Sequence, residues 1–144
     1  MNGIELLISD IENTKELFMK GSLHSHSSKD NKCYYCAGGI ILKEAGVNKN
    51  DFLDKSSIAK VDEDYDIAYD MLNNRYGLDF GKDYDEPIKC PICKKNEEQY
   101  IDSIGNLATA IYHINDFHST SFKQVAENLK EIGKEFNLVT GKRI

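Results

Sequence analysis

The chain lacks a long hydrophobic run, which argues against a membrane-spanning helix. Its longest uninterrupted apolar stretch is only a few residues, whereas a helix needs about 20 apolar residues to cross a bilayer. The N-terminal residues carry acids early and have no basic start followed by an apolar block, so no secretory signal peptide is predicted. We therefore expect a cytoplasmic protein.

The sequence also lacks the common catalytic signatures. It contains no phosphate-binding loop, no glycine pattern of a dinucleotide-binding turn and no Ser-His-Asp pattern. There are no internal repeats and no long linker. These absences favour a non-enzymatic protein, although they leave enzymatic activity open.

Positive charge is in deficit. The 144 residues carry 18 Lys and Arg against 24 Asp and Glu, for a net charge of −6. The imbalance lies in residues 61–90, where nine acids face three bases. Because a chain of this kind repels nucleic acid, we predict no binding to duplex DNA. With 40% apolar residues, the chain can still bury a core of its own.

Cysteine is scarce but paired. Cys33 and Cys36 form one Cys-x-x-Cys pair, and Cys90 and Cys93 form another. Disulfides are rare in a reducing cytosol, whereas four thiolates complete the tetrahedral shell of one zinc ion. We therefore predict one structural Zn²⁺ bound by all four cysteines.

Three alternatives to the four-cysteine site stay open. Cys-Pro-Ile-Cys resembles a thioredoxin-type redox pair, but the polar residues before it do not form the buried strand which that fold requires. The cysteines could instead be unlinked core residues, Cys36 above all, since it heads an apolar helix. A third alternative is that one pair alone binds metal and histidine completes the site.

The histidines are assigned structural or solvated positions. His113 and His118 are five residues apart, which on a helix rotates them by about 140° and puts them on different faces. We expect His113 to end a core helix. His24 and His26 lie in a serine-rich segment predicted to be a solvated loop. Asp116, with the asparagine before it, is predicted to form a turn between two helices.

Apolar periodicity predicts a mainly α fold, with about five helices in one compact domain of residues 1–144. The expected helices cover residues 3–20, 34–46, 63–76 and 98–114, and a last helix opens at Ser121 in a capping box. Residues 77–96 hold both prolines and the second cysteine pair, so we expect an acidic, zinc-binding excursion there. Gly38 and Gly39, adjacent in an apolar helix, predict close packing against another backbone.

Two segments resemble a family of small uncharacterised proteins from bacteria and their phages. The family pattern of a polar loop, Cys-Ala-x-Gly and an apolar helix is matched by Cys36, Ala37 and Gly39. Its C-terminal pattern of an Asn-Asp turn and a Ser-capped helix is matched by Asn115, Asp116 and Ser121. The resemblance implies a helical fold in a phage or prophage setting, and no reaction. The segment DYDEPIKCPICKKN departs from the family pattern.

These observations favour a small, zinc-stabilised binding protein in the cytoplasm of a bacterial host, such as a phage-encoded inhibitor or adaptor acting on a host protein. One alternative is a protein that sequesters a nucleotide signal, with Lys20, Lys29 and Lys32 as candidate contacts. Others are a metal-dependent hydrolase using His113, Asp116 and His118, and a helix-turn-helix DNA binder.

The acidic, tyrosine-rich stretch from Asp62 to Glu86 is the candidate partner surface. Tyrosine is enriched in binding hot spots, and clustered carboxylates steer a basic patch into contact, so we expect a basic partner. The alternative is a solvated helix face whose tyrosines pack inward. The candidate residues are Tyr65, Asp66, Tyr69, Asp70, Asp83, Tyr84 and Asp85.

Overall fold

Helices make up most of the regular structure in the computed structural model, which describes residues 2–65, 67–96 and 103–144, with the backbone alone for Tyr65. The helices in this part of the chain are α1 (Gly3–Asn13), α2 (Ala37–Glu44), α3 (Ile58–Tyr65), α4 (Ala68–Tyr76), α5 (Pro91–Lys95), α6 (Leu107–His118) and α7 (Phe122–Gly133), with a short 3-10 turn η1 (Lys49–Asp51). The predicted mainly α class is matched in part: helices predominate, but they are shorter and more numerous than predicted, and strands accompany them.

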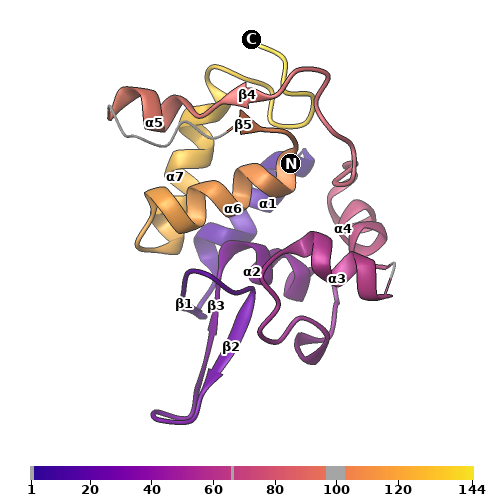
Figure 1. Cartoon of the computed structure of the whole chain (residues 1–144), viewed down its shortest axis with the longest axis vertical. Helices are drawn as coiled ribbons and strands as arrows, with labels where there is room; N and C mark the ends of the chain where they lie inside the picture. The colour runs from indigo at the N-terminus through magenta and orange to yellow at the C-terminus, as the bar shows by residue number, and fades with distance from the viewer. Residues whose placement is uncertain (1, 66, 97–102) are drawn as a thin grey trace.

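Two small sheets accompany the helices and were not predicted. The first has the order β1-β3-β2, from β1 (Leu17–Phe18), β2 (His24–Ser27) and β3 (Lys32–Tyr35). The second pairs β4 (Ile88–Lys89) with β5 (Ser103–Ile104). The β2–β3 hairpin projects from the helical body in Figure 1. Its turn contains Asn31 at a φ of 56°, a left-handed conformation that asparagine tolerates.

These strands shorten two predicted helices. α1 begins at its cap Asn2, whose side chain accepts from the Glu5 amide, and it ends at Asn13. Leu17 and Phe18 then pair with β3 instead of continuing the helix. The predicted helix 34–46 likewise begins as strand β3, and its helical part is α2.

The helices predicted in the middle and C-terminal parts of the chain agree with the structure to different degrees. The predicted helix 63–76 is divided between α3 and α4, and α4 ends at Gly77, whose φ is 63°. Part of the predicted helix 98–114 lies in residues 97–102, outside the described residues; its described part begins with β5, and α6 starts after its cap Asn106. The last helix is confirmed: Ser121 accepts from the Gln124 amide at 3.2 Å and α7 follows.

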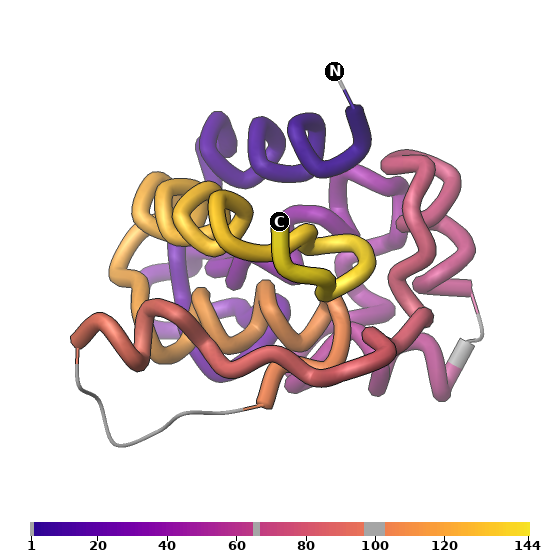
Figure 2. The backbone as a smooth tube through the Cα atoms, turned by 90° about the horizontal axis from the view of Figure 1, so that it is seen from above, coloured from indigo at the N-terminus to yellow at the C-terminus, as the bar shows by residue number. Residues whose placement is uncertain are grey.

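The buried apolar side chains form one cluster to which nearly every helix contributes. α1 lies along α7, and α6 lies between α7 and α2 (Figures 1 and 2). Leu7, Ile41, Ile111 and Leu129 come from these four helices, and each is at most 1% exposed. The core therefore holds in place α6, the helix that carries His113 and His118.

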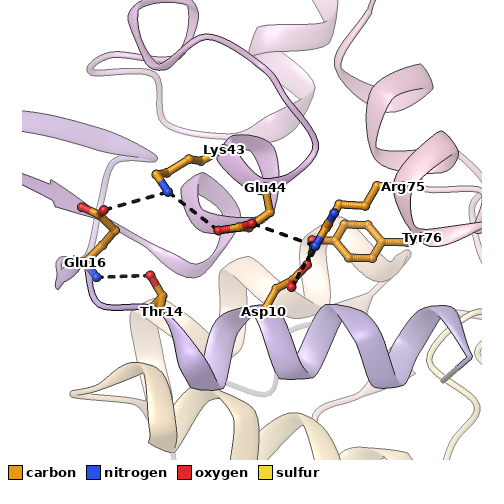
Figure 3. Close-up of polar contacts among 7 residues, drawn as sticks. All are labelled: Asp10, Thr14, Glu16, Lys43, Glu44, Arg75 and Tyr76. Carbon is orange, nitrogen blue, oxygen red and sulfur yellow. Dashed lines mark hydrogen bonds and ion pairs between the residues drawn. The ribbon is translucent and has the colours of Figure 1, made fainter.

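A polar contact ties α1 to α4 at the edge of this core. The Asp10 carboxylate accepts from Arg75 Nε at 2.9 Å, from Arg75 Nη2 at 3.0 Å and from the Tyr76 hydroxyl at 2.6 Å (Figure 3). Figure 3 also shows Glu44 beside Arg75, at 3.9 Å. A two-point Arg–carboxylate contact fixes both distance and orientation.

Asp10→Ala is expected to lower the free energy of unfolding by about 2 kcal/mol, because hydrogen bonds to charged groups at partly buried sites contribute in that range. Lys134→Ala, which removes the exposed ion pair with Glu131, is the matched control. It should change the free energy by less than about 0.5 kcal/mol. Urea denaturation of both variants measures the difference, and equal effects would contradict the expectation.

Among the described residues, no helix is both long enough and apolar enough to cross a membrane.

Candidate metal centre

Four potential metal ligands converge at the end of α6. The ligand atoms of Cys90, Cys93, His113 and His118 all lie within 4.8 Å of one another. Both cysteines and His113 are buried, and His118 is half-buried. A group of two thiols and two imidazoles can hold a metal ion.

The distances within the group fit a tetrahedral shell. His113 Nε2 and His118 Nε2 are 3.1 Å apart, and Cys93 Sγ lies 3.3 Å and 3.1 Å from them. Cys90 Sγ is 3.6 Å from His118 Nε2. Around a tetrahedral zinc ion with ordinary bond lengths, the edges between nitrogen and nitrogen or sulfur would be roughly 3.3–3.6 Å. Four of the six donor pairs thus lie near the distances that one ion requires, and all six lie within 4.8 Å.

The cysteine pair sits on a short turn built by its own backbone. Cys90 caps α5, and its Sγ accepts from the Cys93 amide at 3.4 Å. Pro91 occupies the first turn, where its missing N–H costs nothing. Both sulfur atoms consequently lie on the same side of the turn, and the pairing of β4 with β5 attaches the turn to the segment that enters α6.

The histidine pair comes from the last turns of α6. His118 is the final residue of that helix, and its carbonyl accepts from Asn128 Nδ2 at 3.0 Å, which attaches the helix end to α7. The rings of His113 and His118 meet edge to face, with centroids 4.8 Å apart. The imidazole side chains are therefore long enough to bring the two Nε2 atoms within 3.1 Å of each other, although the two Cα positions lie on different sides of the helix.

The predicted set of four cysteines is corrected by this arrangement. Among the described residues, the structure groups Cys90 and Cys93 with two histidines and leaves Cys33 and Cys36 outside the group. Cys33 lies on the projecting hairpin, opposite His26. Cys36 caps α2 at the core, where burial raises the pKa of its thiol to about 12. A thiol of that kind stays protonated at neutral pH and is a poor metal ligand.

The histidine and Asn-Asp predictions are corrected as well. The ligand atoms of His113 and His118 do lie in one group. Asp116 is outside that group among the described residues, so the hydrolase-like set of these three residues is not assembled. Asn115 and Asp116 lie within α6 and form no turn between helices. The buried Asn115 side chain accepts from the Ala37 amide at 2.9 Å and donates to the Met19 carbonyl at 3.1 Å, so it joins three segments.

The serine-rich segment holds one buried histidine. His24 is 2% exposed, stacks on the Tyr35 ring at 4.4 Å between centroids and lies 3.0 Å from the Tyr34 carbonyl through Nδ1. The prediction of a solvated loop is wrong for His24, because the segment is strand β2. His26 is exposed, as expected.

The candidate partner surface is partly turned inward. Asp70, Asp83 and Asp85 are exposed, and Tyr69 is half-buried. Tyr84 is buried, and its hydroxyl donates to the Leu138 carbonyl, so it does not belong to the surface. The side chain of Tyr65 and the whole of Asp66 lie outside the described residues.

The thiols are expected to differ sharply in reactivity. At pH 8 the metal-bound protein should react with one equivalent of a thiol reagent such as DTNB, at the half-buried Cys33. Cys36 should stay unreactive because its pKa is raised to about 12 by burial, and metal should protect Cys90 and Cys93. Spectrophotometric titration of the protein and of Cys33→Ser checks this. Rapid reaction of two or more thiols would contradict it.

Comparisons with protein-family models, curated proteins and solved structures give no match for this chain.

Proposed function

We propose that the protein is a zinc-stabilised binding protein whose metal has a structural role. The observation that carries the proposal is the convergence of Cys90, Cys93, His113 and His118 within 4.8 Å. Two thiolates and two imidazoles with this spacing suit zinc, which prefers four tetrahedral nitrogen and sulfur ligands. When bound, the ion would supply a fixed link between the α5 turn and the end of α6.

A structural role follows from the number of protein ligands. Catalytic zinc sites keep one position for water or substrate, whereas a site with four protein ligands is closed. Three of the four ligands are also buried, which keeps solvent from the ion. The same residues therefore argue against the hydrolase alternative.

The metal assignment has a direct test. Protein purified without added metal should contain one zinc per chain by elemental analysis. Replacement by Co²⁺ should give the visible spectrum of a tetrahedral ion with thiolate ligands, and added cyanide should leave that spectrum unchanged because no coordination position is open. A metal-free, fully folded protein, or a cobalt spectrum that shifts with cyanide, would overturn the proposal.

We further propose that the partner is a protein with a basic patch, and that the exposed acids Asp70, Asp83 and Asp85 face it. Their charges are part of the stretch in which nine acids outnumber three bases. Clustered charge of one sign speeds the approach of an oppositely charged surface. The phage setting implied by the family resemblance makes a host protein the expected target of an inhibitor or adaptor.

The partner proposal is tested by charge removal at constant fold. A variant with Asp70, Asp83 and Asp85 replaced by Asn should bind a partner isolated from host lysate more slowly, with a flatter dependence of the association rate on salt. The control variant replaces the exposed Glu5, Glu44 and Glu127 with Gln and removes equal charge elsewhere. Equal association rates for the two variants would contradict the proposal and show that these acids are solvated surface without a role in binding.

A further inference from the structure

A cavity outside the metal centre has the features of a small-molecule site. It has a volume of about 330 Å³ and lies where the start of α2, the start of α3 and the first half of α6 meet. Its apolar wall includes Leu23, Ile58 and Ile111, all buried. Ligand pockets usually measure ~300–1,000 Å³, so this cavity suits a small ligand.

The charged side chain in the cavity is a carboxylate. Among the described residues that line it there is no Lys, Arg or His, and Asp116 is the one acidic group. The Asp116 oxygens accept from the Gly21 amide at 3.2 and 3.3 Å, and one of them accepts from Asn115 Nδ2 at 2.9 Å. These donors are neutral, and no base among the described residues forms an ion pair with Asp116.

Two further carboxylates lie next to residues of the cavity wall. Asp62 accepts from the Tyr69 amide at 3.2 Å, and Asp83 accepts from Asn106 Nδ2 at 3.1 Å. Both Tyr69 and Asn106 line the cavity. Burial, together with the charges of Asp62 and Asp83, raises the pKa of Tyr69, which agrees with a negative potential at that wall. These carboxylates oppose an anion and favour a cation at the Tyr69 and Asn106 side of the cavity.

Aromatic rings line the same space. Tyr69 is half-buried, and Tyr112 is 45% exposed. The face of an aromatic ring attracts a nearby cation through the ring quadrupole. Asn106 and Thr109 add polar groups that can hydrogen-bond to a ligand, and the Thr109 hydroxyl is already held by Asn106 Oδ1 at 2.8 Å.

We propose that this cavity binds a small organic cation, an amine or guanidine with a short apolar body, through Asp116 and the rings of Tyr69 and Tyr112. The apolar body lies against the buried wall, and the cationic head lies near the carboxylate. A nucleotide is disfavoured at this cavity because its phosphates would meet the Asp116 carboxylate and, among the described residues that line the cavity, no base. None of the residues that line the cavity belongs to the metal-ligand group.

Three probes that share one ring separate charge from shape. Tyramine is the cation, 4-ethylphenol its neutral counterpart and 4-hydroxyphenylacetate its anion; agmatine supplies a guanidine without a ring. In calorimetry with the metal-bound full chain at pH 7, we expect tyramine or agmatine to bind at least tenfold more tightly than 4-ethylphenol, and the anion to bind most weakly. No binding of either cation at millimolar concentration, or equal binding of the three ring compounds, would overturn the proposal.

Substitutions of single residues test where in the cavity the cation binds. Asp116→Asn keeps an oxygen acceptor for the Gly21 amide, so thermal denaturation should show a folded chain, while affinity for tyramine should fall about tenfold and affinity for 4-ethylphenol should not change. Asp85→Asn removes the same charge at an exposed position outside the cavity and should leave tyramine binding unchanged. Tyr112→Ala should weaken the binding of the cation several-fold. Equal losses in Asp116→Asn and Asp85→Asn would show that net charge alone attracts the probe and would contradict the assignment.

Discussion

Cys90→Ser is expected to abolish stoichiometric metal binding and to lower the free energy of unfolding by about 4 kcal/mol. A ligand that binds the folded state alone, at roughly 1,000 times its dissociation constant, stabilises a protein by about that amount. The metal ligands are assembled only when α6 and the α5 turn are in place, so metal binding and folding are coupled. Chemical denaturation and elemental analysis of the variant measure both effects.

Matched variants decide which residues bind the ion. His118→Ala should lose the metal as Cys90→Ser does, because both belong to the converging group. Cys33→Ser should keep one metal per chain and nearly all of its stability, since Cys33 lies on the projecting hairpin outside that group. Loss of metal in Cys33→Ser with retention in His118→Ala would restore the four-cysteine site.

The expected loss should be greatest around the α5 turn. α5 has five residues and β4 has two, and segments this short do not hold their conformation without tertiary contacts. The cluster of Cys90, Cys93 and the two histidines is what connects this turn to the end of α6. Chelation should therefore raise hydrogen exchange in residues 88–95 first, with α1 and α7 protected for longer.

Half of the metal centre could be predicted from the sequence. The Cys90–Cys93 pair follows from its spacing, and a histidine-completed pair was one of the open alternatives. The signal for His113 and His118 was also present, because four residues separate them, within the three to five found between histidine ligands of zinc. This spacing was set aside because the two Cα positions point to different faces of the helix. That comparison ignores how far an imidazole side chain reaches from the last turns of a helix. The 19 residues between Cys93 and His113 exceed the usual spacing of a short zinc finger.

The same holds for the fold: elements were predicted where the sequence signal is local and missed where their formation depends on tertiary contacts. α7 was predicted correctly because Ser121, its capping box and its apolar stripe all act within one segment. β2 was missed because its sequence HSHS is polar, and β3 was missed because Tyr34 and Tyr35 fit the start of the apolar helix expected at residues 34–46. β1 illustrates the same limit: Leu17 and Phe18 fit the apolar face of a helix, yet they pair with β3. The periodicity of apolar residues does not predict pairings between strands of this kind.

Gly39→Ala is expected to be among the most destabilising single substitutions in the chain. A Cβ atom at Gly39 would lie 1.9 Å from the Leu23 carbonyl oxygen, so the backbone of one segment would have to move. This is the close backbone approach that the adjacent glycines Gly38 and Gly39 predicted. Overpacking of a close-packed interior costs about 1–3 kcal/mol, and a clash with backbone should reach the upper end, about 3 kcal/mol.

Gly38→Ala provides the matched control one residue away in the same helix. There a Cβ atom would lie 2.9 Å from Cδ2 of Leu23, the end of a flexible side chain that can shift at small cost. Replacing glycine by alanine inside a helix also favours folding by about 0.8–1.0 kcal/mol, which offsets that shift. Gly38→Ala should therefore change the free energy of unfolding by less than about 1 kcal/mol. Urea denaturation of the two variants compares them directly, and similar losses would show that α2 does not lie against the Leu23 backbone as closely as its two glycines allow.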